Sequence, residues 1–174
     1  NMIIHSKTET CMTQNHFVSV YQKISSYRGD FHLLQILEGI RDGQWKEQVA
    51  RLRRELKEGN DTEAEKLKKQ LPAFTLSATY RGRRIVSEIT AYSGYIMLDI
   101  DKLTPSEAIR LRSLAATLPH TVFAFVSPSE CGLKIGVQPP DGLPLTLRNH
   151  RDNFQASVVF YEEHLGVRID PSGK

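Results

Sequence analysis

Apolar residues recur at helical spacing in the first part of the chain and alternate as in strands from about residue 73 onward. After a polar, aperiodic start, a short strand is expected near residues 17–21. The spacing of apolar positions then predicts helices over 31–40, 45–57 and 61–70. We expect Asp30 to cap the first of these helices and Pro72 to lie beyond the end of the last.

The second part of the chain reads as strands separated by two helices. A β-hairpin is predicted over 74–80 and 85–91, followed by strands over 95–101, 121–126 and 133–137 and the start of a last strand at 167–170. Thr104-Pro105-Ser106-Glu107 is a capping box that begins a helix running to about Leu118. Apolar residues at helical spacing mark a second helix that ends at Gly166.

This order of elements predicts an α+β fold with a mostly antiparallel sheet flanked by helices. We expect one domain over residues 1–174, with a helical N-terminal part over about 30–72 and a mixed sheet part over about 73–174. The chain stops soon after an apolar–acidic step, with nothing there to close a domain. We therefore expect the domain to be truncated at its C-terminus.

Composition narrows the class of protein without identifying a partner. The 174 residues are 40% hydrophobic and 25% charged, an ordinary globular mixture. We see neither a membrane-length apolar run nor a secretory segment, so a cytoplasmic protein without a membrane partner is expected. Cys11 and Cys131 are far apart and lack zinc-ligand neighbours. The formal net charge of +3 is too small to prove a polyanionic partner.

The candidate chemistry begins with the run Tyr95-Ile-Met-Leu-Asp99-Ile-Asp101, a predicted buried strand that ends in two acids. Side chains alternate across a strand, so Asp99 and Asp101 leave the same face as neighbours. Paired carboxylates repel each other unless a cation lies between them, and a divalent metal ion bound by acids is suited to phosphate chemistry. The simpler alternative is a strand end that emerges into solvent with two hydrated aspartates.

Three further features lie beyond the acid pair. Ser127, Ser129 and Gly132 belong to a turn between two predicted strands, where hydroxyl and N–H groups could hold an anion. Lys134 alternates with apolar neighbours and faces away from them, which also suits an ordinary surface lysine. Asp170 is a third acid, although on its own it is typical first of a cap or turn residue, because Asp-Pro-Ser-Gly is a natural turn.

Basic residues form two clusters. Arg81, Arg83 and Arg84 lie at the expected hairpin tip. The second cluster is interleaved with glutamates, which is typical of a solvated helical face and only secondarily of a nucleic-acid contact. Its members are Arg51, Arg53, Arg54, Lys66, Lys68 and Lys69.

The order of these motifs resembles the archaeo-eukaryotic primase superfamily, the primase–polymerases, whose site combines an hhhDhD strand, a later Ser-x-His strand and a third acid. The closer resemblance is to the N-terminal domain found ahead of helicase modules of the virulence-associated-protein-E type in Bacteroidetes mobile elements. The residues that carry it are Leu67–Phe74, Tyr92–Leu103, Ser127-Pro128-Ser129 and Asp170–Lys174.

The resemblance implies a primase–polymerase-like domain of a DNA replication or mobile-element protein. Its partners would be nucleoside triphosphates, DNA (single-stranded or as primer–template) and an attached helicase module. The implied metal ligands for Mg²⁺ or Mn²⁺ are Asp99, Asp101 and Asp170. Lys134 and the Ser127, Ser129 and Gly132 groups would neutralise phosphate charge, and Arg81, Arg83 and Arg84 would follow a template backbone.

Two departures from the superfamily pattern keep other functions open. Lys134 stands where the superfamily has histidine, and lysine has no acceptor nitrogen. Glu130 stands where related sequences usually have glycine, which puts negative charge near the expected triphosphate. A non-catalytic nucleic-acid-binding or assembly module that serves a helicase is therefore the main alternative. A metal-dependent glycosyltransferase is a lesser alternative, because Asp-x-Asp motifs also bind the metal ion of a nucleotide-sugar.

Overall fold

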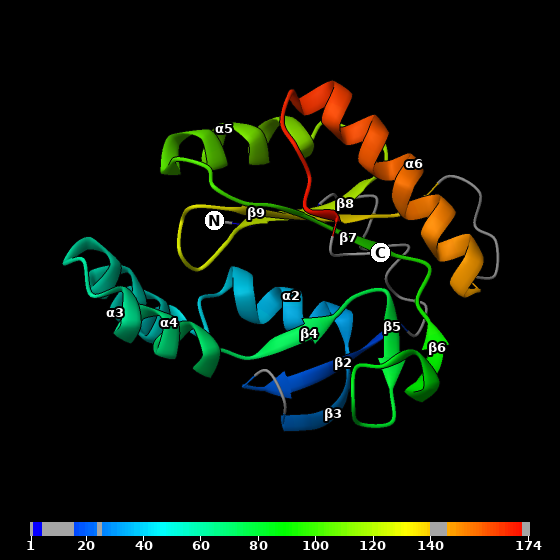
Figure 1. The fold of residues 1–174 in the computed structure, drawn as a ribbon, viewed down its shortest axis with the longest axis horizontal. Coiled ribbons are helices and arrows are strands. Elements are labelled where there is room, and N and C mark those ends of the chain that lie inside the picture. The colour runs from blue at the N-terminus through cyan, green and yellow to red at the C-terminus, as the bar shows by residue number, and fades with distance from the viewer. Residues whose placement is uncertain (1, 5–15, 24–25, 140–145, 172–174) are drawn as a thin grey trace.

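The computed structural model describes residues 2–4, 16–23, 26–139 and 146–171 (Figure 1). The strands are β1 (Met2–Ile4), β2 (Phe17–Gln22), β3 (Ser26–His32), β4 (Ala73–Thr75), β5 (Ala78–Tyr80), β6 (Ile89–Tyr92), β7 (Ile96–Ile100), β8 (Thr121–Val126) and β9 (Leu133–Val137). The helices are α2 (Leu33–Arg41), α3 (Lys46–Lys57), α4 (Asp61–Gln70), α5 (Pro105–Ala115), α6 (Leu147–Leu165) and a single 3₁₀ turn, η1 (Val86–Glu88). The predicted α+β class and antiparallel pairing are confirmed.

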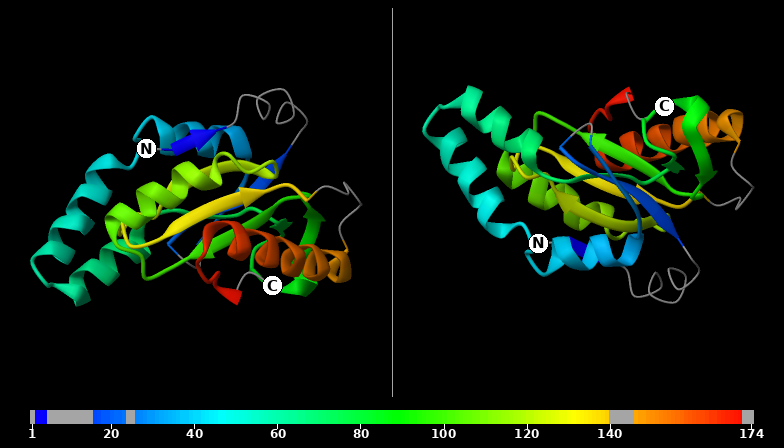
Figure 2. Two further views of the ribbon diagram at one scale, coloured as in Figure 1. Left: turned by 90° about the horizontal axis from the view of Figure 1, so that it is seen from above. Right: turned by 90° about the horizontal axis from the view of Figure 1, so that it is seen from below.

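The largest sheet has the strand order β1-β8-β9-β7 and lies between two layers. Helices α5 and α6 cover one face, while α2 and a three-stranded sheet, β3-β2-β4, lie on the other (Figures 1 and 2). The remaining pair, β5 and β6, forms a separate hairpin. The large sheet is therefore buried on both faces, which agrees with the dense run of apolar residues in β8.

The alternation of side chains in β7 decides which way its acidic residue points. Ile96, Leu98 and Ile100 are buried in the cluster formed with α5 and α6. Met97 packs instead with the residues of α2 and β2. Because side chains alternate along a strand, Asp99 shares the face of Met97. The first acid of the pair thus points toward the α2 layer and away from the two covering helices.

Helices α3 and α4 form a hairpin that projects beyond one end of the sheets (Figures 1 and 2). Leu52, Ala64 and Leu67 give it a small core of its own. The predicted helices are confirmed here, and Leu71, which precedes Pro72, leaves the helix in an extended conformation. This hairpin carries all six residues of the second basic cluster.

Several local predictions are confirmed at the residues that define them. The capping box of α5 is present, with the Thr104 side chain accepting from the Glu107 N–H and the Glu107 carboxylate accepting from the Thr104 N–H. Gly166 ends α6 with a φ of 68°, a left-handed conformation that favours glycine. The Arg81–Arg84 segment lies in the connection between β5 and β6, as expected for a hairpin tip. The second strand, predicted over 85–91, begins only at Ile89, because Val86–Glu88 form η1.

Other local predictions are wrong. Asp30 does not cap α2: it lies in β3 and accepts hydrogen bonds from Ser19 and Tyr27, while His32 caps the helix. The long strand predicted over 74–80 is divided, because β4 pairs with β2 whereas β5 pairs with β6. Within the aperiodic start, residues 2–4 form β1. Residues 167–170 form no regular strand.

Candidate functional site

The candidate site starts from an ion pair across two neighbouring strands. The register of β7 and β9 places Asp99 directly opposite Lys134. The Lys134 ammonium donates to Oδ2 of Asp99, and each side chain is about one-third exposed, at 31% for Lys134 and 32% for Asp99. Lys134 turns away from the buried Leu133 and Ile135, as the sequence predicts. The Lys134 cation thus neutralises the first acid.

The second carboxylate oxygen of Asp99 is in a different situation. Oδ1 is buried and has no hydrogen-bond partner among the described residues. An ionised carboxylate oxygen is a strong acceptor, and leaving it buried without a partner costs about 1–3 kcal/mol. Such an atom is a place where a bound cation or hydrogen-bond donor would be stabilised.

Asp101 lies just past the end of β7, close to the turn over residues 127–132. Gly132 brings the two segments together: a Cβ at this position would lie 2.8 Å from the Ile100 carbonyl oxygen and 3.3 Å from Oδ1 of Asp101. The same Cβ would lie 3.2 Å from the Ser127 hydroxyl. Residue 132 is therefore glycine because any side chain would separate the turn from the acid pair.

The turn itself uses some of its polar groups internally. The Ser127 N–H donates to the Gly132 carbonyl (2.8 Å), and the Glu130 N–H donates to the Ser127 carbonyl (3.0 Å). The hydroxyls of Ser127 and Ser129 are 3.1 Å apart, and Ser127 is buried. These two N–H groups are engaged within the turn and are therefore not available to the predicted anion.

Asp170 reaches the first acid through the backbone. Its N–H donates to the carbonyl oxygen of Asp99 at 2.8 Å, so the segment after α6 runs beside the edge strand β7 (Figure 1). Ile169 is buried with the residues of α5 and α6, which fixes this segment against the sheet. The third acid therefore lies next to the first, although the predicted strand does not form.

Carboxylates are the type of ligand that a divalent metal ion prefers, but these carboxylates are not arranged around a common position. Within the described ranges, no three His, Cys, Asp or Glu side chains are arranged to hold a metal ion. Oxygen ligands are what Mg²⁺ and Mn²⁺ prefer, and the buried Oδ1 of Asp99 is an acceptor in need of a partner. Three of the described carboxylates could share one metal ion only after a rearrangement of their side chains.

The arginines of the hairpin tip are not brought to the acids. Figure 1 draws the β5–β6 connection at the lower edge of the molecule, away from the large sheet. Arg83 pairs with Glu88 (2.8 Å), and Arg84 lies 5.0 Å from the centre of the Tyr21 ring. Arg81 donates its backbone N–H to the Glu88 carbonyl. At least two of these three side chains thus have protein partners outside the site.

One residue near the site was not singled out by the sequence. Arg53 of α3 donates from Nε to the Pro128 carbonyl (3.0 Å), and its guanidinium lies 3.0 Å from the Glu130 carboxylate. It thereby holds the turn that also contacts Asp101. Its sequence context, a helix with alternating charges, gives no signal that this arginine differs from its neighbours.

Comparisons with known proteins give a single finding. A family model described as BT4734-like, N-terminal domain, matches residues 66–174, which contain every acid and turn residue of the candidate site. No curated protein and no solved structure matches the chain. None of the described helices is both long and apolar enough to cross a bilayer.

Proposed function

The chain belongs to the family described as BT4734-like, N-terminal domain, and from that premise we propose that it is a primase–polymerase-like domain. In this proposal it binds a nucleoside triphosphate with a divalent metal ion and acts on DNA in replication or in a mobile element. An attached helicase module in the full-length protein is part of the same proposal.

The observation that carries the proposal is the convergence of segments far apart in the sequence. The Asp170 N–H bonds to the Asp99 carbonyl, and the 127–132 turn packs against Asp101. The resemblance to primase–polymerases depends on these segments in this order. Their meeting at one edge of one sheet supports a shared site.

In the proposed site, Asp99, Asp101 and Asp170 would hold Mg²⁺ or Mn²⁺, which when bound would neutralise charge on a triphosphate and on its leaving pyrophosphate. Lys134 exchanges its carboxylate partner for a phosphate oxygen when nucleotide binds. The hydroxyls of Ser127 and Ser129 donate to the same phosphate chain. Gly132 keeps the turn close enough for these donors to act beside Asp101.

Binding of a fluorescent nucleoside triphosphate, titrated with and without Mn²⁺, tests the proposal. Asp101→Asn is the sharpest variant, because Asp101 is exposed and no ion pair to it is found among the described residues. We expect it to abolish Mn²⁺-dependent binding while leaving the thermal unfolding midpoint unchanged. Asp152→Asn, an exposed change on α6, is the matched control and should bind as the unmodified protein does. Equal Mn²⁺-dependent binding by Asp101→Asn would refute the metal-ligand role.

A specific observation favours a second candidate, a non-catalytic module that binds nucleic acid for an attached helicase. The Asp99 carboxylate is already paired with Lys134, and the described carboxylates do not gather around a common point. Primer extension and dinucleotide synthesis by the full-length protein discriminate the two candidates. DNA binding without any Mn²⁺- or Mg²⁺-dependent synthesis would favour the module.

A further inference from the structure

An open groove of about 490 Å³ lies between α3 and the turn over residues 127–132. Figure 2 shows α3 beside the end of the large sheet where this turn lies. The groove is lined by Ala50, Arg53, Arg54, Leu56, Lys57, Pro105, Ser129 and Glu130. Its position next to Ser129 links it to the candidate site, because the same turn contacts Asp101 through Gly132.

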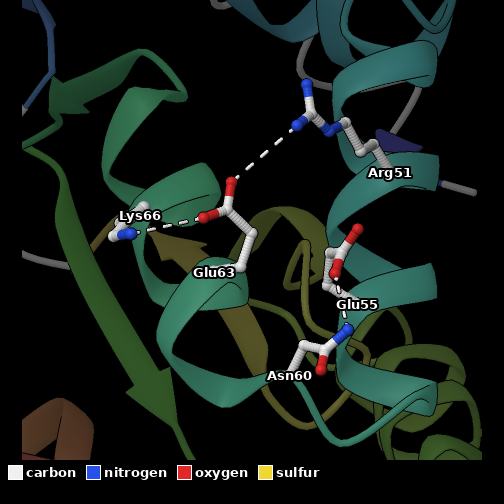
Figure 3. A network of polar contacts seen from close by, with 5 residues as sticks. All are labelled: Arg51, Glu55, Asn60, Glu63 and Lys66. Atoms are coloured by element: carbon white, nitrogen blue, oxygen red, sulfur yellow. Dashed lines mark hydrogen bonds and ion pairs between the residues drawn. The ribbon is translucent and has the colours of Figure 1, made fainter.

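The groove is basic because the charges of α3 are divided between its two sides. On the side facing α4, Arg51 lies 3.8 Å from the Glu63 carboxylate, which also pairs with Lys66 at 3.4 Å (Figure 3). On the groove side, Arg54 and Lys57 are exposed and have no ion pair within the described part of the chain. Glu63 of α4 thus neutralises charge on one side of α3, and the other side keeps unbalanced positive charge.

Glu130 is the one acid among the groove-lining residues. Its carboxylate lies 3.0 Å from the Arg53 guanidinium, and the two side chains are 44% and 39% exposed. Its φ of 65° is left-handed, a conformation that costs an ordinary residue about 1–2 kcal/mol and that glycine adopts freely. The chain therefore keeps a carboxylate in front of Arg53 despite an unfavourable backbone conformation.

We propose that this groove binds the phosphodiester backbone of a nucleic-acid strand, and that Glu130 competes with the strand's phosphates for Arg53. Arg53, Arg54 and Lys57 make the phosphate contacts. None of the groove-lining residues is aromatic, so no base-stacking surface is available and binding is independent of sequence. That the bound strand leads past Ser129 to the acid pair rests on the proposed function, whereas binding in the groove does not.

Fluorescence anisotropy with a labelled oligodeoxythymidylate, in EDTA and without nucleotide, tests the groove apart from the metal site. We expect Arg53→Ala to weaken binding by roughly 2- to 5-fold, the range for an exposed ion pair. The Arg54→Ala/Lys57→Ala double variant should weaken it further, and the salt slope should fall by about 0.7 for each phosphate that the variant no longer neutralises. Arg51→Ala is the matched control on the same helix and should change neither quantity.

Glu130→Gln tests the competition. Removing the carboxylate should strengthen binding by roughly 2- to 5-fold. The same substitution should leave binding unchanged in an Arg53→Ala background, because the guanidinium for which Glu130 competes is then missing. Unchanged binding by Glu130→Gln alone would overturn the competition.

Two further results would overturn the groove as a strand-binding site. One is a weakening in Arg51→Ala as large as in the Arg54→Ala/Lys57→Ala variant, which would mean general attraction to a basic helix. The other is displacement of the oligonucleotide by a metal-free nucleoside triphosphate added at the same total concentration of phosphate charge. That result would mean that the groove binds the nucleotide and not the strand. Because this assay contains EDTA and no nucleotide, failure of the proposed metal site would leave strand binding in the groove intact, so the two failures give different results.

Discussion

A single methyl group at residue 132 should separate the turn from the acid pair. The Cβ of Gly132→Ala would lie 2.8 Å from the Ile100 carbonyl oxygen, 3.2 Å from the Ser127 hydroxyl and 3.3 Å from Oδ1 of Asp101. The first of these atoms belongs to the backbone of β7, which is held by its ladder with β9 and does not rotate away. The turn must therefore move by several tenths of an ångström to accept the methyl group.

The expected cost follows from the tightness of that contact. Forcing an extra methyl group into a packed region costs about 1–3 kcal/mol. For a chain of this size, each kcal/mol lowers the unfolding midpoint by about 2–4 °C, so we expect a decrease of roughly 2–12 °C. Because the turn that must move carries the Ser127 hydroxyl, Mn²⁺-dependent nucleotide binding should fall as well. Thermal unfolding and nucleotide titration of one preparation measure both effects.

Two other glycines calibrate the result. A Cβ at Gly82 would meet only Oε2 of Glu88, at an ordinary 3.6 Å, so Gly82→Ala should stay within about 0.5 kcal/mol of the unmodified protein. A Cβ at Gly136 would overlap the fully buried Phe123 ring, so Gly136→Ala should be the most destabilising of the three. If Gly132→Ala unfolds and binds nucleotide as Gly82→Ala does, the close contact between turn and acid pair is not what the site requires.

Three further predictions concern groups around the same sheets. Burial raises the pKa of Tyr161 from 10.0 to about 12, so the unfolded chain loses this proton first as the pH rises. The free energy of unfolding should therefore fall by about 2–3 kcal/mol between pH 10 and 12. Urea titrations at several pH values measure this decrease, and Tyr161→Phe should lack the part that comes from Tyr161. For the partly exposed ion pair, a double-mutant cycle of Asp99→Asn and Lys134→Gln in EDTA should give a coupling of about 1 kcal/mol, and additive effects would exclude the pair in solution. Ser19→Ala should lower the free energy of unfolding by about 1–3 kcal/mol, because it removes the acceptor of the Tyr80 N–H (2.8 Å). Chemical denaturation measures the change, and an unchanged midpoint would mean that water replaces the hydroxyl.

Much of the fold follows from local signals. The capping box at Thr104, the left-handed Gly166 and the alternation in β7 act over a few residues, and each appears in the structure as the sequence predicts. The errors fall where pairing between distant strands decides the outcome. Phe31 reads as helical, for example, but it belongs to β3 because β2 pairs with that segment. Tertiary pairing overrides local propensity at such positions.

In the candidate site, too, local patterns predict some features, while others depend on contacts between distant parts of the chain. Strand periodicity is enough to put Asp99 on the face opposite Ile100, and the register with β9 then makes Lys134 its partner. No local pattern reveals that Asp170 reaches Asp99 without forming a strand, because the contacts that hold it there are made with distant parts of the chain. They include the bond from its N–H to the Asp99 carbonyl and the burial of Ile169. The division of charge on α3 is equally invisible, since it depends on which side α4 packs against.

The turn over residues 127–132 explains why a primase-like site and a strand-binding groove would occur together. Its glycine contacts Asp101 on one side, and its Pro128 carbonyl and Glu130 carboxylate contact Arg53 on the other. A phosphate that draws Arg53 away from Glu130 removes one of the two contacts that hold the turn to α3. The turn is then held mainly by β8, β9 and the hydrogen bond from Leu103 to the Cys131 carbonyl. If both proposals hold, a change in the groove would reach the acid pair through one short segment of chain.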